Sequence, residues 1–174
     1  MPNRPSGTMV RPSSTAVGLS LAMLLFSLGS PILAQDNPIS RATAIDGDTI
    51  NLHSEPITLN GIDAPETDQT CADSAGATYA CGQRASQVLA KKIADYPVHC
   101  DQFEHDPDAG KVAHCSAGGE DLGGYMVTTG WAVANTLKTL EYLRAEQWAK
   151  KAKYGMWQGN FVMPWNWREG ERLE

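Results

Sequence analysis

The sequence predicts a β-rich α+β domain, and three observations support this class. Apolar and polar residues alternate in segments 40–60, 98–103 and 111–117, as they do in half-buried strands. Apolar residues recur at helical spacing within 82–94 and 139–154. The four cysteines lie in this same part of the chain, and their even count favours disulfides that stabilise the domain.

Residues 40–60 are expected to form a small meander of three strands. Ile50 and Leu52 alternate with polar residues after an Asp-Gly turn, and Ile57 and Leu59 follow a second turn. Asp, Gly and Pro are the residues that such tight turns prefer, because they tolerate the backbone angles required.

Two further strands are expected at 98–103 and 111–117, which makes five in all. The acidic segment EHDPDAG at 104–110 reads as the loop between them. Its histidine and aspartates would offer ligands for a second cation, but we favour a solvated loop, the commoner role of such a segment.

Three helices complete the predicted domain. The apolar period places one helix at 82–94, after a loop that precedes it. Asp121 is a suitable N-cap for a second helix that ends near Gly130. A third helix is expected over 139–154, with Gly155 as its C-cap.

The tail after the third helix is rich in aromatic residues but has no period of its own. It carries Trp157, Phe161, Trp165 and Trp167. Aromatic rings can stack on nucleic-acid bases. We favour the alternative, in which these rings pack an irregular tail onto the core.

Residues 1–34 are expected to be a secretory signal peptide, and residues 35–174 a single domain. Basic residues precede an apolar stretch at 16–28, and a Gly-Ser-Pro break precedes a cleavage site after Ala34. An uncleaved membrane anchor is the alternative, which the short apolar stretch disfavours. The protein is therefore predicted to be exported, either to a periplasm or to the exterior.

The predicted domain is acidic. After Ala34 the chain has 12 Lys and Arg residues against 20 Asp and Glu residues, a net charge of −8. Nucleic-acid binders usually neutralise phosphates with Lys and Arg. A nucleic-acid partner therefore remains possible but is disfavoured, and the sequence identifies no protein partner.

The four cysteines allow three disulfide pairings. We favour Cys71 with Cys81, which closes a short loop, and Cys100 with Cys115, which lie on two predicted strands. A zinc site is the competing interpretation, but the spacings contain no CxxC pair of the kind that zinc ligands usually form.

Two acidic turns carry the candidate chemistry, DGDT at 46–49 and GIDAPE at 61–66. An Asp-Gly pair between strands is by default only a turn. The second acidic turn changes the interpretation, because Asp48, Asp63 and Glu66 would together offer the oxygen ligands that a hard cation prefers.

These motifs resemble the staphylococcal-nuclease (thermonuclease) family, and the resemblance spans nearly all of the predicted domain. It implies an oligonucleotide/oligosaccharide-binding (OB) fold, a five-stranded β-barrel with three helices. It rests on the following segments: AIDGDT at 44–49, ITLNGIDAPE at 57–66, CGQRA at 81–85, GGEDLGGYMVTTGWA at 118–132, the stretch 146–150, YGMW at 154–157 and PWNWR at 164–168.

The resemblance also implies roles for individual residues. The family cleaves the phosphodiesters of DNA and RNA with Ca²⁺ as cofactor. Asp48 and Asp63 would be the Ca²⁺ ligands together with the backbone carbonyl of Ala64. Glu66 would act as the general base that orients or deprotonates the attacking water.

Both arginines that clamp phosphate in the family are replaced. Thr58 occupies the first arginine position, and Gly110 occupies the second, five residues before Cys115. Lys111 lies one residue after this second arginine position, and on a strand a displacement of one residue turns the side chain to the opposite face. It is nevertheless a tentative phosphate contact, because the loop could shift its register.

We therefore expect an exported thermonuclease-like domain that keeps the Ca²⁺ carboxylates and acts as a metal-dependent binding module, with weak or absent nuclease activity. An alternative is a functional phosphodiesterase in which Lys111 or Arg84 replaces the arginines. A further alternative is a structural or protein-interaction barrel whose carboxylates only shape turns.

Overall fold

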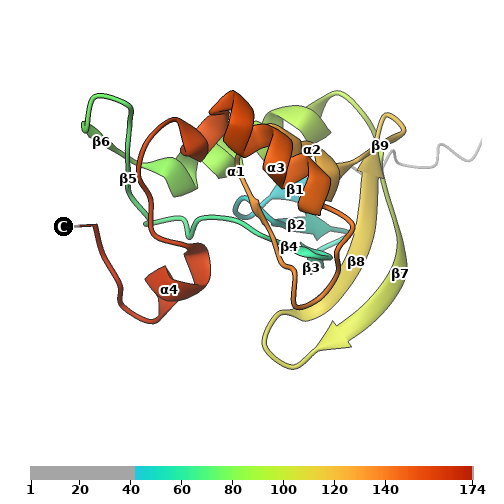
Figure 1. Cartoon of the computed structure of the whole chain (residues 1–174). Helices are drawn as coiled ribbons and strands as arrows, with labels where there is room; N and C mark the ends of the chain where they lie inside the picture. Colours follow the sequence, from blue (N-terminus) through green and yellow to red (C-terminus); the bar gives the residue numbers. More distant parts are fainter. Residues whose placement is uncertain (1–41, 174) are drawn as a thin grey trace, which may run out of the picture. The chain divides into compact units, whose positions relative to one another are not determined.

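The computed structural model describes residues 42–173, and within them a curled mixed sheet carries helices on one side (Figure 1). The predicted signal peptide at 1–34 lies outside the described residues. No helix among residues 42–173 is both long and apolar enough to cross a membrane. The predicted class, a β-rich α+β fold of the OB type, is confirmed.

The main sheet follows the order β1-β2-β3-β8-β7, which matches the five predicted strands. β3 and β8 pair in parallel, whereas the other neighbours are antiparallel. A short β9 extends the sheet beside β8. The strands are β1 (Thr43–Ala44), β2 (Thr49–Leu52), β3 (Glu55–Leu59), β7 (Val98–Asp106), β8 (Gly110–Ala117) and β9 (Glu120–Asp121).

Four short strands outside this sheet were not predicted. They form two separate pairs, and each pair has only two residues per strand. Strands so short show no alternation that a sequence pattern could reveal. They are β4 (Ile62–Asp63) with β10 (Val133–Ala134), and β5 (Cys71–Ala72) with β6 (Thr78–Tyr79).

The predicted loop at 104–110 is shorter than expected. β7 continues to Asp106, which pairs with Gly110 on β8, so only residues 107–109 form the turn. Gly110 has a φ of 74°, a left-handed value that favours glycine over residues with a side chain. The backbone of this turn thus gives a physical reason for glycine at position 110.

The first two helices follow the prediction. α1 (Cys81–Ala94) buries Ala85, Leu89 and Ile93, the apolar face expected from its period. α2 (Leu122–Thr128) is capped by Asp121, whose carboxylate accepts a hydrogen bond of 2.5 Å from the Gly124 N–H.

The third and fourth helices correct the prediction. α3 (Leu143–Ala152) begins four residues later than expected, because residues 140–142 form a bend and a turn instead. Its C-cap is Lys153 in a left-handed conformation rather than Gly155. After a single 3-10 turn, η1 (Gly155–Gln158), the tail forms an unpredicted helix, α4 (Pro164–Arg168).

Two apolar clusters hold these elements together. The larger lies between the sheet and the first two helices, and its largest fully buried side chains are Ile50, Ile57, Leu59, Leu89, Leu122 and Met126. The smaller surrounds Cys71 and Cys81 and includes Trp157 and Phe161, whose rings pack edge to face at 4.7 Å. The packing role expected for the tail aromatics is therefore confirmed for these two rings.

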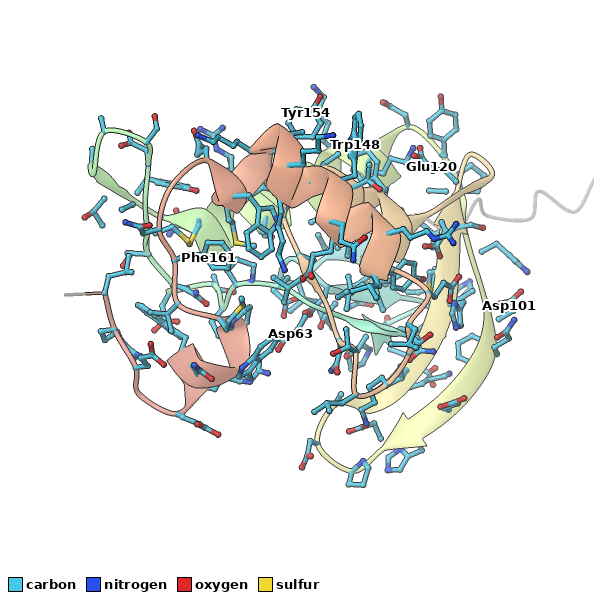
Figure 2. The ribbon with its side chains drawn as sticks, in the orientation of Figure 1. Asp63, Asp101, Glu120, Trp148, Tyr154 and Phe161 are labelled. Atoms are coloured by element: carbon cyan, nitrogen blue, oxygen red, sulfur yellow. A yellow bond between two sulfur atoms is a disulfide. The ribbon has the colours of Figure 1, made fainter. Side chains whose placement is uncertain are left out.

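Both favoured disulfides are confirmed. Cys71 is bonded to Cys81, and Cys100 is bonded to Cys115, which lies directly opposite it on the neighbouring strand. All four cysteines are used in this way, so none is a zinc ligand. Trp148 of α3 points away from the core into solvent (Figure 2).

Candidate functional site

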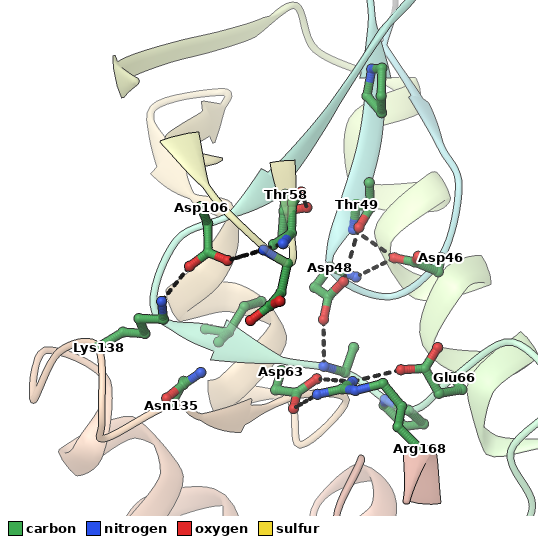
Figure 3. Close-up of a pocket in the computed structure, with 16 residues that line it drawn as sticks. Asp46, Asp48, Thr49, Thr58, Asp63, Glu66, Asp106, Asn135, Lys138 and Arg168 are labelled. Carbon is green, nitrogen blue, oxygen red and sulfur yellow. Dashed lines mark hydrogen bonds and ion pairs between the residues drawn. The ribbon is translucent and has the colours of Figure 1, made fainter. Parts of the chain in front are cut away.

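A cavity of about 530 Å³ opens where the β1–β2 turn, β4, the β7–β8 turn and α4 meet (Figure 3). Six acidic side chains and two basic ones line it. The acidic residues are Asp46, Asp48, Asp63, Glu66, Asp106 and Asp108, and the basic residues are Lys138 and Arg168.

Asp46 shapes the turn that presents Asp48. Its Oδ1 accepts hydrogen bonds from the backbone N–H groups of Asp48, at 3.0 Å, and of Thr49, at 2.7 Å. This is the local turn role that an Asp-Gly pair has by default.

Asp48 is held in place by two donors. Its Oδ2 accepts a hydrogen bond of 2.6 Å from the Ala64 N–H, and its Oδ1 accepts one of 3.1 Å from the Thr49 hydroxyl. Burial of the carboxyl raises the pKa of Asp48 well above its ordinary value, and the neighbouring Asp46 raises it further. A cation beside Asp48 would oppose both effects.

Asp63 and Glu66 share one arginine. Arg168 donates to both oxygens of Asp63, at 2.9 and 2.7 Å, and to Oε1 of Glu66, at 2.6 Å. Asp63 is only 6% exposed, so it depends on this partner. The hydrogen bond that Arg168 donates to Asp63, and then the one that it donates to Glu66, raise the pKa of Arg168, which therefore stays charged.

Lys138 pairs with a different carboxylate of the cavity. It forms an ion pair with Asp106, which also accepts hydrogen bonds from the N–H groups of Asp108 and Ala109. The Lys138 ammonium, followed by the two N–H groups, lowers the pKa of Asp106 to about 2. Asp106 is therefore engaged in holding the β7–β8 turn.

The structure brings together the acidic positions expected from the sequence. Asp48, Asp63, Ala64 and Glu66 all line the cavity, although they lie on separate turns. Thr58 lines it as well, and its hydroxyl donates to the Ala109 carbonyl at 3.3 Å.

The other residues considered as phosphate contacts, or as the family's arginine positions, lie outside this cavity. Lys111 pairs with Glu55 at 2.6 Å and lies over the Phe103 ring, and neither it nor Gly110 lines the cavity. Arg84 lines a separate surface cavity of about 510 Å³.

Sequence reasoning missed both basic side chains of the cavity. Lys138 lies in a turn segment without any period, and Arg168 ends a helix of only five residues. The sequence did hold one signal for Arg168, because it ends an aromatic segment of a tail that was expected to pack on the core. The sequence had also assigned no cationic partner to the carboxylates of Asp63 and Glu66.

The donor set fits a hard cation by its chemistry, because carboxylate and carbonyl oxygens are the ligands that Ca²⁺ prefers. Within residues 42–173, no three side chains of His, Cys, Asp or Glu converge as a preformed metal cluster. A metal ion bound by Asp48 and Asp63 would have to share the Asp63 carboxylate with Arg168 or displace the arginine from it.

Comparison with known proteins agrees with the fold and with the motifs. The family model of staphylococcal nuclease homologues matches residues 56–159. The chain is also similar to the succinoglycan biosynthesis protein ExoI of Rhizobium meliloti (strain 1021). That similarity has 35% identity over 149 residues, which cover 84% of this chain and 77% of ExoI.

Proposed function

Because the chain belongs to the family of staphylococcal nuclease homologues, we propose that it is a divalent-cation-binding domain whose hydrolysis of phosphodiesters is weak or absent. The family is generally Ca²⁺-dependent. In this proposal Asp48 and Asp63, with the Ala64 carbonyl, hold the metal ion, and Glu66 positions a water molecule. A bound Ca²⁺ would supply positive charge to an anionic ligand.

The observation that carries the proposal is the charge of the cavity. Six carboxylates face two cations, and both cations are already ion-paired. A phosphodiester would be repelled by the unpaired carboxylates. Thr58 offers it one hydroxyl where the family has a bidentate arginine, which matches phosphate far better.

Slow phosphodiester hydrolysis is the second candidate, and the positions of Lys138 and Arg168 favour it over the alternatives expected from the sequence. Both side chains line the cavity, whereas Lys111 and Arg84 do not. The name of ExoI refers to a biosynthetic process rather than to nucleic-acid cleavage, which favours the first candidate.

Export remains part of the proposal. Two disulfides in a domain of this size are typical of oxidising compartments, such as a periplasm or the exterior of the cell. They are compatible with export, and the signal peptide at 1–34 with cleavage after Ala34 stays a prediction.

Calorimetric titration of the full chain with Ca²⁺ tests the metal site. We expect binding that weakens by about tenfold or more in Asp48→Asn, because the neutral amide keeps an acceptor for the Ala64 N–H but loses the charge that attracts a hard cation. The affinity should also fall as the pH is lowered, because protons compete for the ligands.

Asp108→Asn is the matched control, because Asp108 is an exposed carboxylate of the same cavity and is not among the ligands proposed for this metal ion. It should leave the affinity nearly unchanged. Absence of Ca²⁺ binding, or equal affinity in Asp48→Asn and the wild type, would eliminate the metal-binding proposal and leave the structural barrel.

A further inference from the structure

Arg168 reaches the candidate metal site from a part of the chain that the family model does not match. It ends α4, beyond the matched residues 56–159. Its guanidinium contacts both oxygens of Asp63 and one oxygen of Glu66, more than a hundred residues away in the sequence. Figure 3 shows it entering the cavity from the side opposite Lys138.

The backbone of Arg168 is well anchored. The preceding Trp167 is 8% exposed, and its Nε1 donates to Asp68 at 3.3 Å. Pro164 is fully buried at the start of α4, and Arg172 lies over the Trp167 ring at 3.7 Å. The Arg168 side chain, however, is 49% exposed, so solvent is accessible to it if it leaves the carboxylates.

Arg168 and a divalent ion would need the same charges. The arginine satisfies Asp63 and Glu66 through a planar fork that uses three of its five N–H donors. A metal ion bound by Asp63 would sit close to this guanidinium, and two cations at short range repel each other strongly in a partly buried site. Without either cation, the buried Asp63 would be left uncompensated.

We propose that Arg168 is an internal cation that competes with a divalent metal ion for Asp63 and Glu66, and thereby sets the metal concentration at which the site fills. This inference rests on the proposed metal-binding function. Arg168 keeps the carboxylates paired when metal is scarce, and it swings toward solvent when metal binds. The site therefore binds Ca²⁺ less tightly than its carboxylates alone would allow.

Titration of the full chain with Ca²⁺, comparing the wild type with Arg168→Gln, tests this competition. We expect Arg168→Gln to bind Ca²⁺ about tenfold more tightly or better, because the competing charge is gone. Lys138→Gln is the matched control: it removes one positive charge from the same cavity, but Lys138 pairs with Asp106. Its affinity should rise much less.

Thermal melting of the same proteins gives a second readout. Without Ca²⁺, Arg168→Gln should melt below the wild type because Asp63 loses its partner, and saturating Ca²⁺ should raise its melting temperature more than that of the wild type. Arg168→Lys keeps the positive charge but not the planar fork of the guanidinium. Its Ca²⁺ affinity and its melting temperature should lie between those of the wild type and Arg168→Gln, so it can replace Arg168→Gln if that variant folds poorly.

The outcomes separate the two proposals. If Arg168→Gln and the wild type bind Ca²⁺ equally, or the variant binds it more weakly, the competition is refuted while the metal site stands. If neither protein binds Ca²⁺, the proposed function fails and the competition fails with it.

Discussion

Replacing all four cysteines with alanine is expected to lower the free energy of unfolding by about 6 kcal/mol. Each bridge lowers the conformational entropy of the unfolded chain, which stabilises the folded state by about 3 kcal/mol for loops of this length. The bridges join residues 10 and 15 apart in the sequence. Domains of this size are commonly stable by only 5 to 15 kcal/mol. The variant should therefore be marginally folded or unfolded, as measured by urea denaturation.

Two partial variants serve as controls. Cys71→Ala with Cys81→Ala, and Cys100→Ala with Cys115→Ala, should each lose about half of the total effect. If the urea denaturation midpoint of the wild type is the same with and without a reducing agent, the stabilising role of the bridges is contradicted.

Gly82→Ala is expected to destabilise the domain by about 3 kcal/mol, although alanine favours helices more than glycine does. A Cβ atom at Gly82 would lie 1.7 Å from the backbone oxygen of Glu66 and 2.6 Å from its carbonyl carbon. Both atoms are backbone, so the start of α1 or the turn that carries Glu66 must move. The loss is measurable by urea denaturation.

The adjacent Gln83→Ala is the control for this prediction. Gln83 is exposed on the same turn of α1, so its replacement should change stability little. The two possible effects at Gly82 have opposite signs. Helix propensity alone would make Gly82→Ala more stable by up to about 1 kcal/mol, and such a gain would show that the close packing is absent.

Local patterns predicted the elements that are long or capped. The period of α1, the alternation along the central strands and the Asp121 cap are properties of neighbouring residues, and each was predicted. The late start of α3 and the length of β7 were not. The length of β7 depends on its register with β8, and residues 140–142, just before α3, form a bend and a turn that leave no period in the sequence.

The residues of the candidate site also divide into those that local sequence patterns predicted and those that they did not. The carboxylates lie in two turn motifs that can be recognised in sequence, and the structure brings them to one cavity. Of the two cations of that cavity, Lys138 lies in no motif, and Arg168 ends the PWNWR segment, to which the sequence assigned no role; both positions depend on how the chain after β10 folds back. The sequence therefore predicted an anionic site but not the arginine that neutralises part of it.

The central claim, that the domain keeps the acidic site of its family but not efficient hydrolysis, is tested most directly by one assay. The rate at which the full chain cleaves single-stranded DNA in saturating Ca²⁺ is compared with that of Glu66→Gln. We predict equal rates, because a general base has little to act on where phosphate is not clamped. A wild-type rate about a hundredfold or more above that of Glu66→Gln, the range of an effective general base, would contradict the claim.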